Sequence, residues 1–160
     1  MKKLISIALI FTLLLSLTAC TKDKADWKTA KHTYSLLGFS VEYSYPNWLE
    51  AISSDDDSTF MLLEDETNTS NWSLLFNINE MSYLEFNDYK GEGAKSANDI
   101  LQENDIWIFK YTEPYQRTVM LKWFECGKTL IVNKSTDFDL NDAIKVVESL
   151  SIDVFGEDVR

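Results

Sequence analysis

Two neighbouring segments of this sequence carry aromatic or large apolar side chains at both sets of alternating positions. They are IWIFKY at residues 106–111 and RTVMLKWFE at residues 117–125. Successive side chains of a strand point to opposite faces of its sheet, and a face open to water usually carries polar residues at every second position. Both faces of these strands must therefore be covered by helices, by a ligand or by another protein.

Further segments have the alternation or the composition of strands. The apolar residues Phe39, Val41, Tyr43 and Tyr45 alternate with polar ones, and residues 59–63, 72–79 and 128–135 are rich in apolar side chains. Cys126-Gly127 lies between two of the predicted strands, and glycine adopts the positive φ of a tight hairpin without strain. The sequence thus predicts about six strands, most of them antiparallel neighbours.

Two segments have the periodicity of helices. Within residues 87–103 the side chains Ala94, Ala97, Ile100 and Leu101 fall on one helical face, although Gly91 and Gly93 weaken its start. Residues 140–150 carry a second apolar stripe, which Asp139 or Asp142 is suited to cap. A short helix over residues 27–34 is an alternative to an irregular tether there. We expect an α+β fold, a mainly antiparallel sheet with two or three helices packed on it.

The first twenty residues have the order of features found in an export signal. Lys2 and Lys3 give a positive start, and residues 4–17 form an apolar core that is too short to span a bilayer comfortably. Leu17-Thr18-Ala19-Cys20 then resembles, position for position, the lipobox of bacterial lipoproteins. The resemblance implies a diacylglycerol on the thiol of Cys20, cleavage just before Cys20, and attachment to the bacterial cell membrane or outer membrane, facing away from the cytoplasm.

The chain is accordingly expected to have four parts. They are a signal peptide (1–19), the lipidated Cys20 with a tether (20–36), one globular domain (37–155) and a tail (156–160). The formal net charge is −11, and loss of Lys2 and Lys3 with the signal peptide makes it −13. Nucleic acids and anionic lipid surfaces require basic faces, so neither is an expected partner of this acidic domain. The acyl chains are then what holds the protein to the membrane.

Two short motifs resemble the PsbP/Mog1-type fold of small bacterial lipoproteins. One is a Phe-x-Val-x-Tyr strand that runs into a Tyr-Pro-x-Trp turn, from Phe39 to Trp48. The other is the end of the last helix followed by ESLSI, from Glu148 to Ile152. The resemblance implies an antiparallel sheet between helices and an accessory role, such as assembly or partner binding, in place of an enzymatic reaction.

The residues that usually carry chemistry are sparse. The single histidine, His32, falls in the predicted tether, where we expect it to be solvated. The acidic clusters at residues 55–57 and 137–142 lack the turn glycine and the distal glutamate of a calcium loop. No phosphate-binding or nucleophile motif occurs in the sequence. We therefore expect no catalytic residue, metal site or cofactor, and a quiet thiol at Cys126.

Four aromatic residues are the candidate binding surface, because Tyr and Trp dominate binding hot spots. They are Tyr89, Tyr111, Tyr115 and Trp123. The leading hypothesis is a lipid-anchored, non-enzymatic envelope protein whose domain binds a protein partner or a small ligand. The alternative is an acidic immunity or inhibitor lipoprotein that covers a basic toxin or enzyme. A third hypothesis, a carboxylate-based enzyme, requires a cleft with two acids and a raised pKa.

Overall fold

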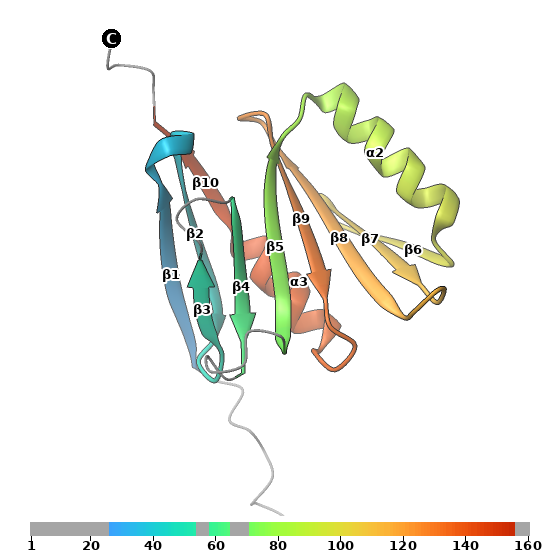
Figure 1. Cartoon of the computed structure of the whole chain (residues 1–160), viewed down its shortest axis with the longest axis horizontal. Helices are drawn as coiled ribbons and strands as arrows, with labels where there is room; N and C mark the ends of the chain where they lie inside the picture. The colour runs from blue at the N-terminus through green and yellow to red at the C-terminus, as the bar shows by residue number, and fades with distance from the viewer. Residues whose placement is uncertain (1–25, 54–57, 65–70, 156–160) are drawn as a thin grey trace, which may run out of the picture.

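The computed structural model describes residues 26–53, 58–64 and 71–155. In this part the chain forms two antiparallel sheets and two α-helices (Figure 1). The predicted signal peptide, Cys20, the tail at 156–160 and the acidic cluster at 55–57 lie outside the described residues. The described part contains no helix that is both long enough and apolar enough to cross a membrane.

The strands, in chain order, are β1 (Trp27–Tyr34), β2 (Phe39–Pro46), β3 (Glu50–Ser53), β4 (Thr59–Leu63), β5 (Trp72–Glu80), β6 (Asp99–Glu103), β7 (Ile106–Tyr111), β8 (Arg117–Phe124), β9 (Lys128–Lys134) and β10 (Ser151–Val154). The helices are α2 (Tyr83–Ser96) and α3 (Leu140–Ser149), and a short 3-10 turn, η1, spans Ser35–Leu37. One sheet has the order β1-β2-β10, and the other has the order β3-β4-β5-β9-β8-β7-β6.

The α+β class and the antiparallel pairing are confirmed, but the strand count is not. The described residues form ten strands in two sheets, where the sequence predicted about six strands in one. Four strands of the structure were not predicted from the sequence: β1, β3, β6 and β10. They are short or polar, so their sequences lack the apolar alternation that identifies a half-buried strand. The predicted hairpin between β8 and β9 is present, with Gly127 at a φ of 75°.

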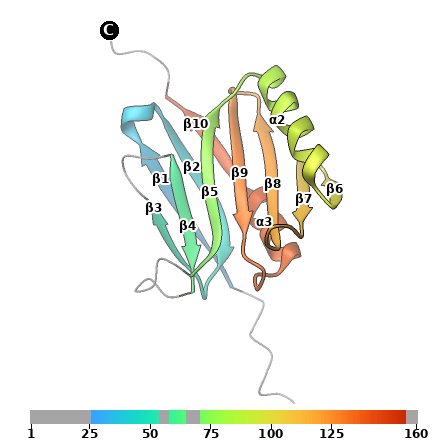
Figure 2. The same cartoon turned by 45° about the vertical axis from the view of Figure 1, so that its right-hand side comes forward.

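The main core lies between the seven-stranded sheet and a layer made of the small sheet and α3. Apolar residues of β2 pack there against one face of β4, β5 and β9. At its centre the rings of Phe60 and Phe76 are stacked, with centroids 4.3 Å apart, and Tyr43 stacks on Phe60. The side of the large sheet that faces this layer is called the inner face below. On the opposite, outer face lies α2 (Figures 1 and 2).

The predicted tether at residues 20–36 is wrong from Trp27 onward, and so is the alternative of a short helix. Trp27–Tyr34 is strand β1, which pairs along its whole length with β2. Tyr34 is buried, and the ring of His32 packs against Tyr43 and Phe60. The strand was missed because Ala30 and His32, which pack toward the core between Trp27 and Tyr34, are only weakly apolar. His32 is half-buried instead of solvated, with Nε2 2.9 Å from the hydroxyl of Tyr43.

The predicted helix within residues 87–103 is displaced. Helix α2 begins four residues earlier, because Ser82 and Glu85 form a capping box: each side chain binds the backbone N–H of the other. These hydrogen bonds hold the pKa of Glu85 below its usual value. The helix ends at Ser96, and Asp99–Glu103 is the edge strand β6. Ile100 and Leu101 are therefore partly exposed on that edge, and not on a helical face.

The last helix agrees with its prediction. Helix α3 buries Ala143, Ile144, Val146 and Val147 in the main core. Of the two predicted capping residues, Asp139 is the N-cap, and its side chain accepts a hydrogen bond from the backbone N–H of Asp142 at 3.0 Å. The acidic cluster at 137–142 therefore includes a helix cap and an ion-paired residue, because Asp142 contacts Lys145 at 3.2 Å.

The capping box gives the first testable prediction. Replacement of Ser82 by Ala removes the acceptor for an orphan N–H at the start of α2 and is expected to cost about 1 kcal/mol of unfolding free energy. Ser35→Ala, in the exposed turn η1, is the matched control and should change little. Urea unfolding of the full chain measures both variants. Equal stability of Ser82→Ala and the wild type would show that the cap does not hold α2.

Candidate functional site

Helix α2 covers only part of the outer face. The side chains on this face are Trp107, Phe109 and Tyr111 of β7, Val119, Leu121 and Trp123 of β8, and Ile131 and Asn133 of β9. The buried anchor of α2 is Phe86, which packs on Phe109 and Leu121. On β5 and β4 the same face carries both polar and apolar side chains. Thr59 and Asn77 hydrogen-bond to each other. Leu75 and Met61 continue the row from Asn133. The apolar surface thus extends past the helix over β9 and in part onto β5 and β4.

A glycine sets the distance between α2 and the sheet. The hydroxyl of Tyr111 donates a hydrogen bond to the backbone oxygen of Gly93 at 3.3 Å. A Cβ at position 93 would lie 3.4 Å from that hydroxyl and 3.8 Å from Phe109, whereas a Cβ at Gly91 would meet nothing within 4 Å. Gly93 therefore lets the second half of the helix approach β7 closely, at the cost of helix propensity.

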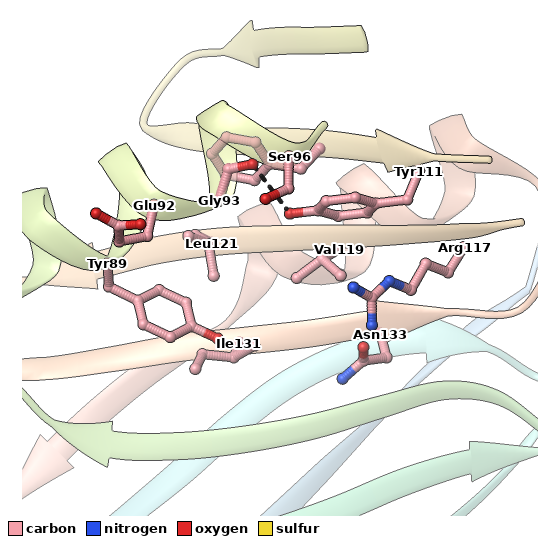
Figure 3. A pocket seen from close by; sticks show the side chains of 11 residues that line it. Tyr89, Glu92, Gly93, Ser96, Tyr111, Arg117, Val119, Leu121, Ile131 and Asn133 are labelled. Atoms are coloured by element: carbon pink, nitrogen blue, oxygen red, sulfur yellow. Dashed lines mark hydrogen bonds between the residues drawn. The ribbon is translucent and has the colours of Figure 1, made fainter. Parts of the chain in front are cut away.

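A groove of about 320 Å³ opens between the second half of α2 and strands β7 to β9. Figure 3 shows its lining: the helix contributes Tyr89, Glu92, Gly93 and Ser96, and the sheet contributes Phe109, Tyr111, Arg117, Val119, Leu121, Ile131 and Asn133. Val119, Leu121 and Ile131 form an apolar floor. In Figure 3 Arg117 and Asn133 lie toward one end of the groove, and Tyr89 and Glu92 lie toward the other.

Arg117 is the unusual member of this lining. Its guanidinium carbon lies 4.5 Å from the ring centroid of Tyr111 and 5.6 Å from that of Tyr115. Its Nε is buried without a hydrogen-bond partner, and among the described residues it forms no ion pair. The cation is thus held by two aromatic rings, while part of its hydrogen-bonding capacity is unused.

Tyr111 is held in its neutral form. Burial raises the pKa of its hydroxyl above the usual value, and the neighbouring Tyr89 adds to that rise, although the charge of Arg117 works in the opposite direction. The phenol therefore keeps its proton at neutral pH and donates it in the hydrogen bond to the backbone oxygen of Gly93. The groove thus combines a neutral phenol, an unpaired cation and an apolar floor.

The structure brings together three of the four aromatic residues predicted as a binding surface. Tyr89 and Tyr111 line the groove, and Tyr115 contacts Arg117 at its end. Trp123 is separate, because it lies under the first turn of α2, where its Nε1 donates to the backbone oxygen of Met81 at 3.3 Å. Its ring meets Tyr83 edge-on, with centroids 5.0 Å apart. Trp123 therefore helps to seat the helix.

The sequence analysis missed Arg117 and Asn133. Both are polar residues on predicted strands, at positions that share a face with Val119 and Ile131 respectively. The alternation from Arg117 through Val119 to Leu121 contained this information. Of the other residues considered, Cys126 lies exposed in the β8–β9 turn. No cluster of three metal-ligating side chains is found in the described ranges.

The fit of α2 against β7 gives the second prediction. Gly91→Ala is expected to raise the unfolding free energy by about 0.5–1 kcal/mol, because alanine favours a helix interior and the new methyl group meets open space. Gly93→Ala should gain less, since its methyl group is pressed against Tyr111. Urea unfolding of the two variants measures the difference. Equal gains would contradict the close approach of Gly93 to the sheet.

Comparison with known proteins identifies no relative. No protein-family model, no curated protein and no solved structure gives a significant match to this chain.

Proposed function

We propose that this protein is a lipid-anchored, non-enzymatic envelope protein whose domain binds a small ligand in the groove beside α2. The observation that carries the proposal is the groove itself, at the place where the apolar outer face extends past its covering helix. The sequence required a cover on both faces of β7 and β8. The inner face is packed in the main core, whereas the cover on the outer face stops short of β9.

The shape of the groove favours a small molecule over a protein partner. Its volume of about 320 Å³ is at the lower end of the range for small-molecule sites, and its lining combines an apolar floor with a few polar groups. A stable protein interface instead needs about 800 Å² of surface from each partner. The acidic immunity or inhibitor alternative relies on free negative charge, which the six ion pairs of the described part leave largely in place, so the preference for a small ligand rests on the groove and not on charge.

The lining also supports a binding role over a catalytic one. A carboxylate-based enzyme needs two acids that converge in a cleft, at least one of them shielded from water. The described lining of the groove has one carboxylate, that of Glu92, which is exposed and paired with Lys95. Antiparallel sheet layers between helices also agree with what the PsbP/Mog1 resemblance implies, and that family's accessory roles support binding without chemistry.

The lipobox supports the membrane location. Strand β1 begins at Trp27, so six residues separate it from Cys20. At about 3.3 Å per residue a fully extended link of this length reaches roughly 20–25 Å. Acylation of Cys20 would therefore keep the domain close to the lipid surface, where it meets small molecules that partition between the membrane and water.

The anchoring part is tested by cysteine variants. Cys20→Ser is expected to abolish incorporation of labelled palmitate and to release the protein from the membrane fraction, because two acyl chains are lost. Cys126→Ser removes the other cysteine and should leave labelling and fractionation unchanged. Metabolic labelling and membrane fractionation measure both effects. Membrane association of Cys20→Ser, or wild-type protein without label, would contradict the proposal.

The binding part is tested by obstructing the groove. Ser96 lies at its mouth on the last turn of α2, and Ser96→Trp is expected to weaken binding of naphthyl probes at least about tenfold by occupying their space. Lys95→Trp adds the same ring at the adjacent exposed position and is the control. Saturation-transfer NMR on the full chain in nanodiscs, with empty nanodiscs as a blank, measures binding of 2-naphthol, 2-naphthoate and 2-naphthyl phosphate. Binding of none of the three, or equal binding by both variants, would refute ligand binding in this groove.

A further inference from the structure

We infer that the ligand carries an anionic oxygen group, a carboxylate or a phosphate, which Arg117 binds, on an apolar body that lies along the floor of the groove. This inference rests on the proposed function, because it names the chemistry of the molecule that the groove holds. Its starting point is a cation that the rest of the domain leaves uncompensated.

Among the cations of the described part, Arg117 alone has a buried donor without a hydrogen-bond partner. Lys31 and Lys90 also form no ion pair, but Lys31 is exposed and Lys90 donates to the side chain of Asn87. Of the nine lysines in the described part, six form ion pairs with Asp or Glu. Lys134, which is largely buried, instead donates to the backbone oxygens of Ser135 and Phe138. Arg117 is the one arginine of the described part, and its buried Nε has no hydrogen-bond partner there. The Nε itself is shielded by the protein, so an acceptor from outside the chain would reach the Nη groups of the same guanidinium, which lines the groove.

The rings beside Arg117 leave its hydrogen bonds free. Tyr111 and Tyr115 approach the guanidinium with their rings, which offer it a π-system but no carboxylate acceptor. The in-plane donors then remain for an acceptor. A carboxylate or a phosphate matches this planar fork with two parallel hydrogen bonds. The two rings thus orient a recognition group, and they supply no charge that would neutralise it.

The other polar groups fix which way the ligand lies. The side-chain amide of Asn133 and the hydroxyl of Ser96 are further donors in the lining. The hydroxyl of Tyr111 is not, because its proton is already donated to Gly93. Glu92 lies toward the opposite end from Arg117 and would repel an anion placed there (Figure 3). The head group therefore belongs beside Arg117, with the apolar body over Val119, Leu121 and Ile131.

The volume limits the size of the ligand. About 320 Å³ accommodates a molecule with one or two rings, or a short alkyl chain, together with a head group. Asn133 is the last lining residue on this side, and beyond it the outer face continues with Leu75 of β5 and Met61 of β4, outside the groove. A small aryl or alkyl acid fits these dimensions, whereas a membrane phospholipid with two full acyl chains does not.

The test compares probes that share one apolar body. The full chain in nanodiscs is titrated with 2-naphthoate, 2-naphthyl phosphate and the neutral 2-naphthol, and affinities are measured by saturation-transfer NMR against empty nanodiscs. We expect at least one anion to bind about tenfold or more tightly than 2-naphthol, and the better of the two anions distinguishes a carboxylate from a phosphate ligand. Arg117→Gln should abolish this preference while binding of 2-naphthol is retained. Arg117→Lys should keep only part of it, because an ammonium lacks the planar fork.

Lys31→Gln is the matched control, since it removes one positive charge from the exposed side of β1, in the other sheet. It should leave all three affinities unchanged, and urea unfolding checks that every variant is folded. Equal affinity of the anions and 2-naphthol, or an unchanged preference in Arg117→Gln, would overturn the inference and leave the proposed groove standing. Binding that Ser96→Trp does not weaken would overturn both.

Discussion

The structure depends on the need to cover both faces of β7 and β8. On the inner face Ile106, Ile108 and Met120 are sealed by the layer of the small sheet and α3. On the outer face the cover is one largely polar helix whose buried anchor is Phe86. Large apolar surfaces are stable in water only when they are removed from it. The difference between a complete inner cover and a partial outer cover decides where this domain can accept another molecule.

The inner core is built around a group of stacked aromatic rings. Phe60 and Phe76 stack across neighbouring strands, and Tyr43 packs on both rings from the facing sheet. Aromatic pairs of this kind add about 0.5–1.5 kcal/mol each beyond the burial of their surface. Burial raises the pKa of Tyr43, so its hydroxyl stays neutral beside His32. These contacts join β1 and β2 to the large sheet.

The parts of the fold that the sequence predicted are those with regular apolar alternation. Strands such as β2 and β5, and helix α3 with its cap at Asp139, repeat apolar residues at the period of their element. Strand β1 was missed because Ala30 and His32 are weak apolar signals, and β6 because Ile100 and Leu101 also fit a helix. Of the candidate site, the tyrosines were predicted and Arg117 was not. An arginine at the start of a strand has no local signature, and whether it stays unpaired depends on which acids the fold keeps away from it.

The absence of an acid beside Arg117 is informative because acids are abundant in this chain, at 26 Asp and Glu against 15 Lys and Arg. A fold with this surplus can neutralise a cation at little cost, and six of the described lysines are neutralised in this way. An ion pair within the chain would occupy the fork of Arg117 and close the polar end of the groove. Two tyrosine rings instead stabilise the charge without supplying a carboxylate acceptor, which keeps both the cation and its donors available. Such an arrangement suits an acid that arrives from outside and leaves again, because the site stays folded in its absence.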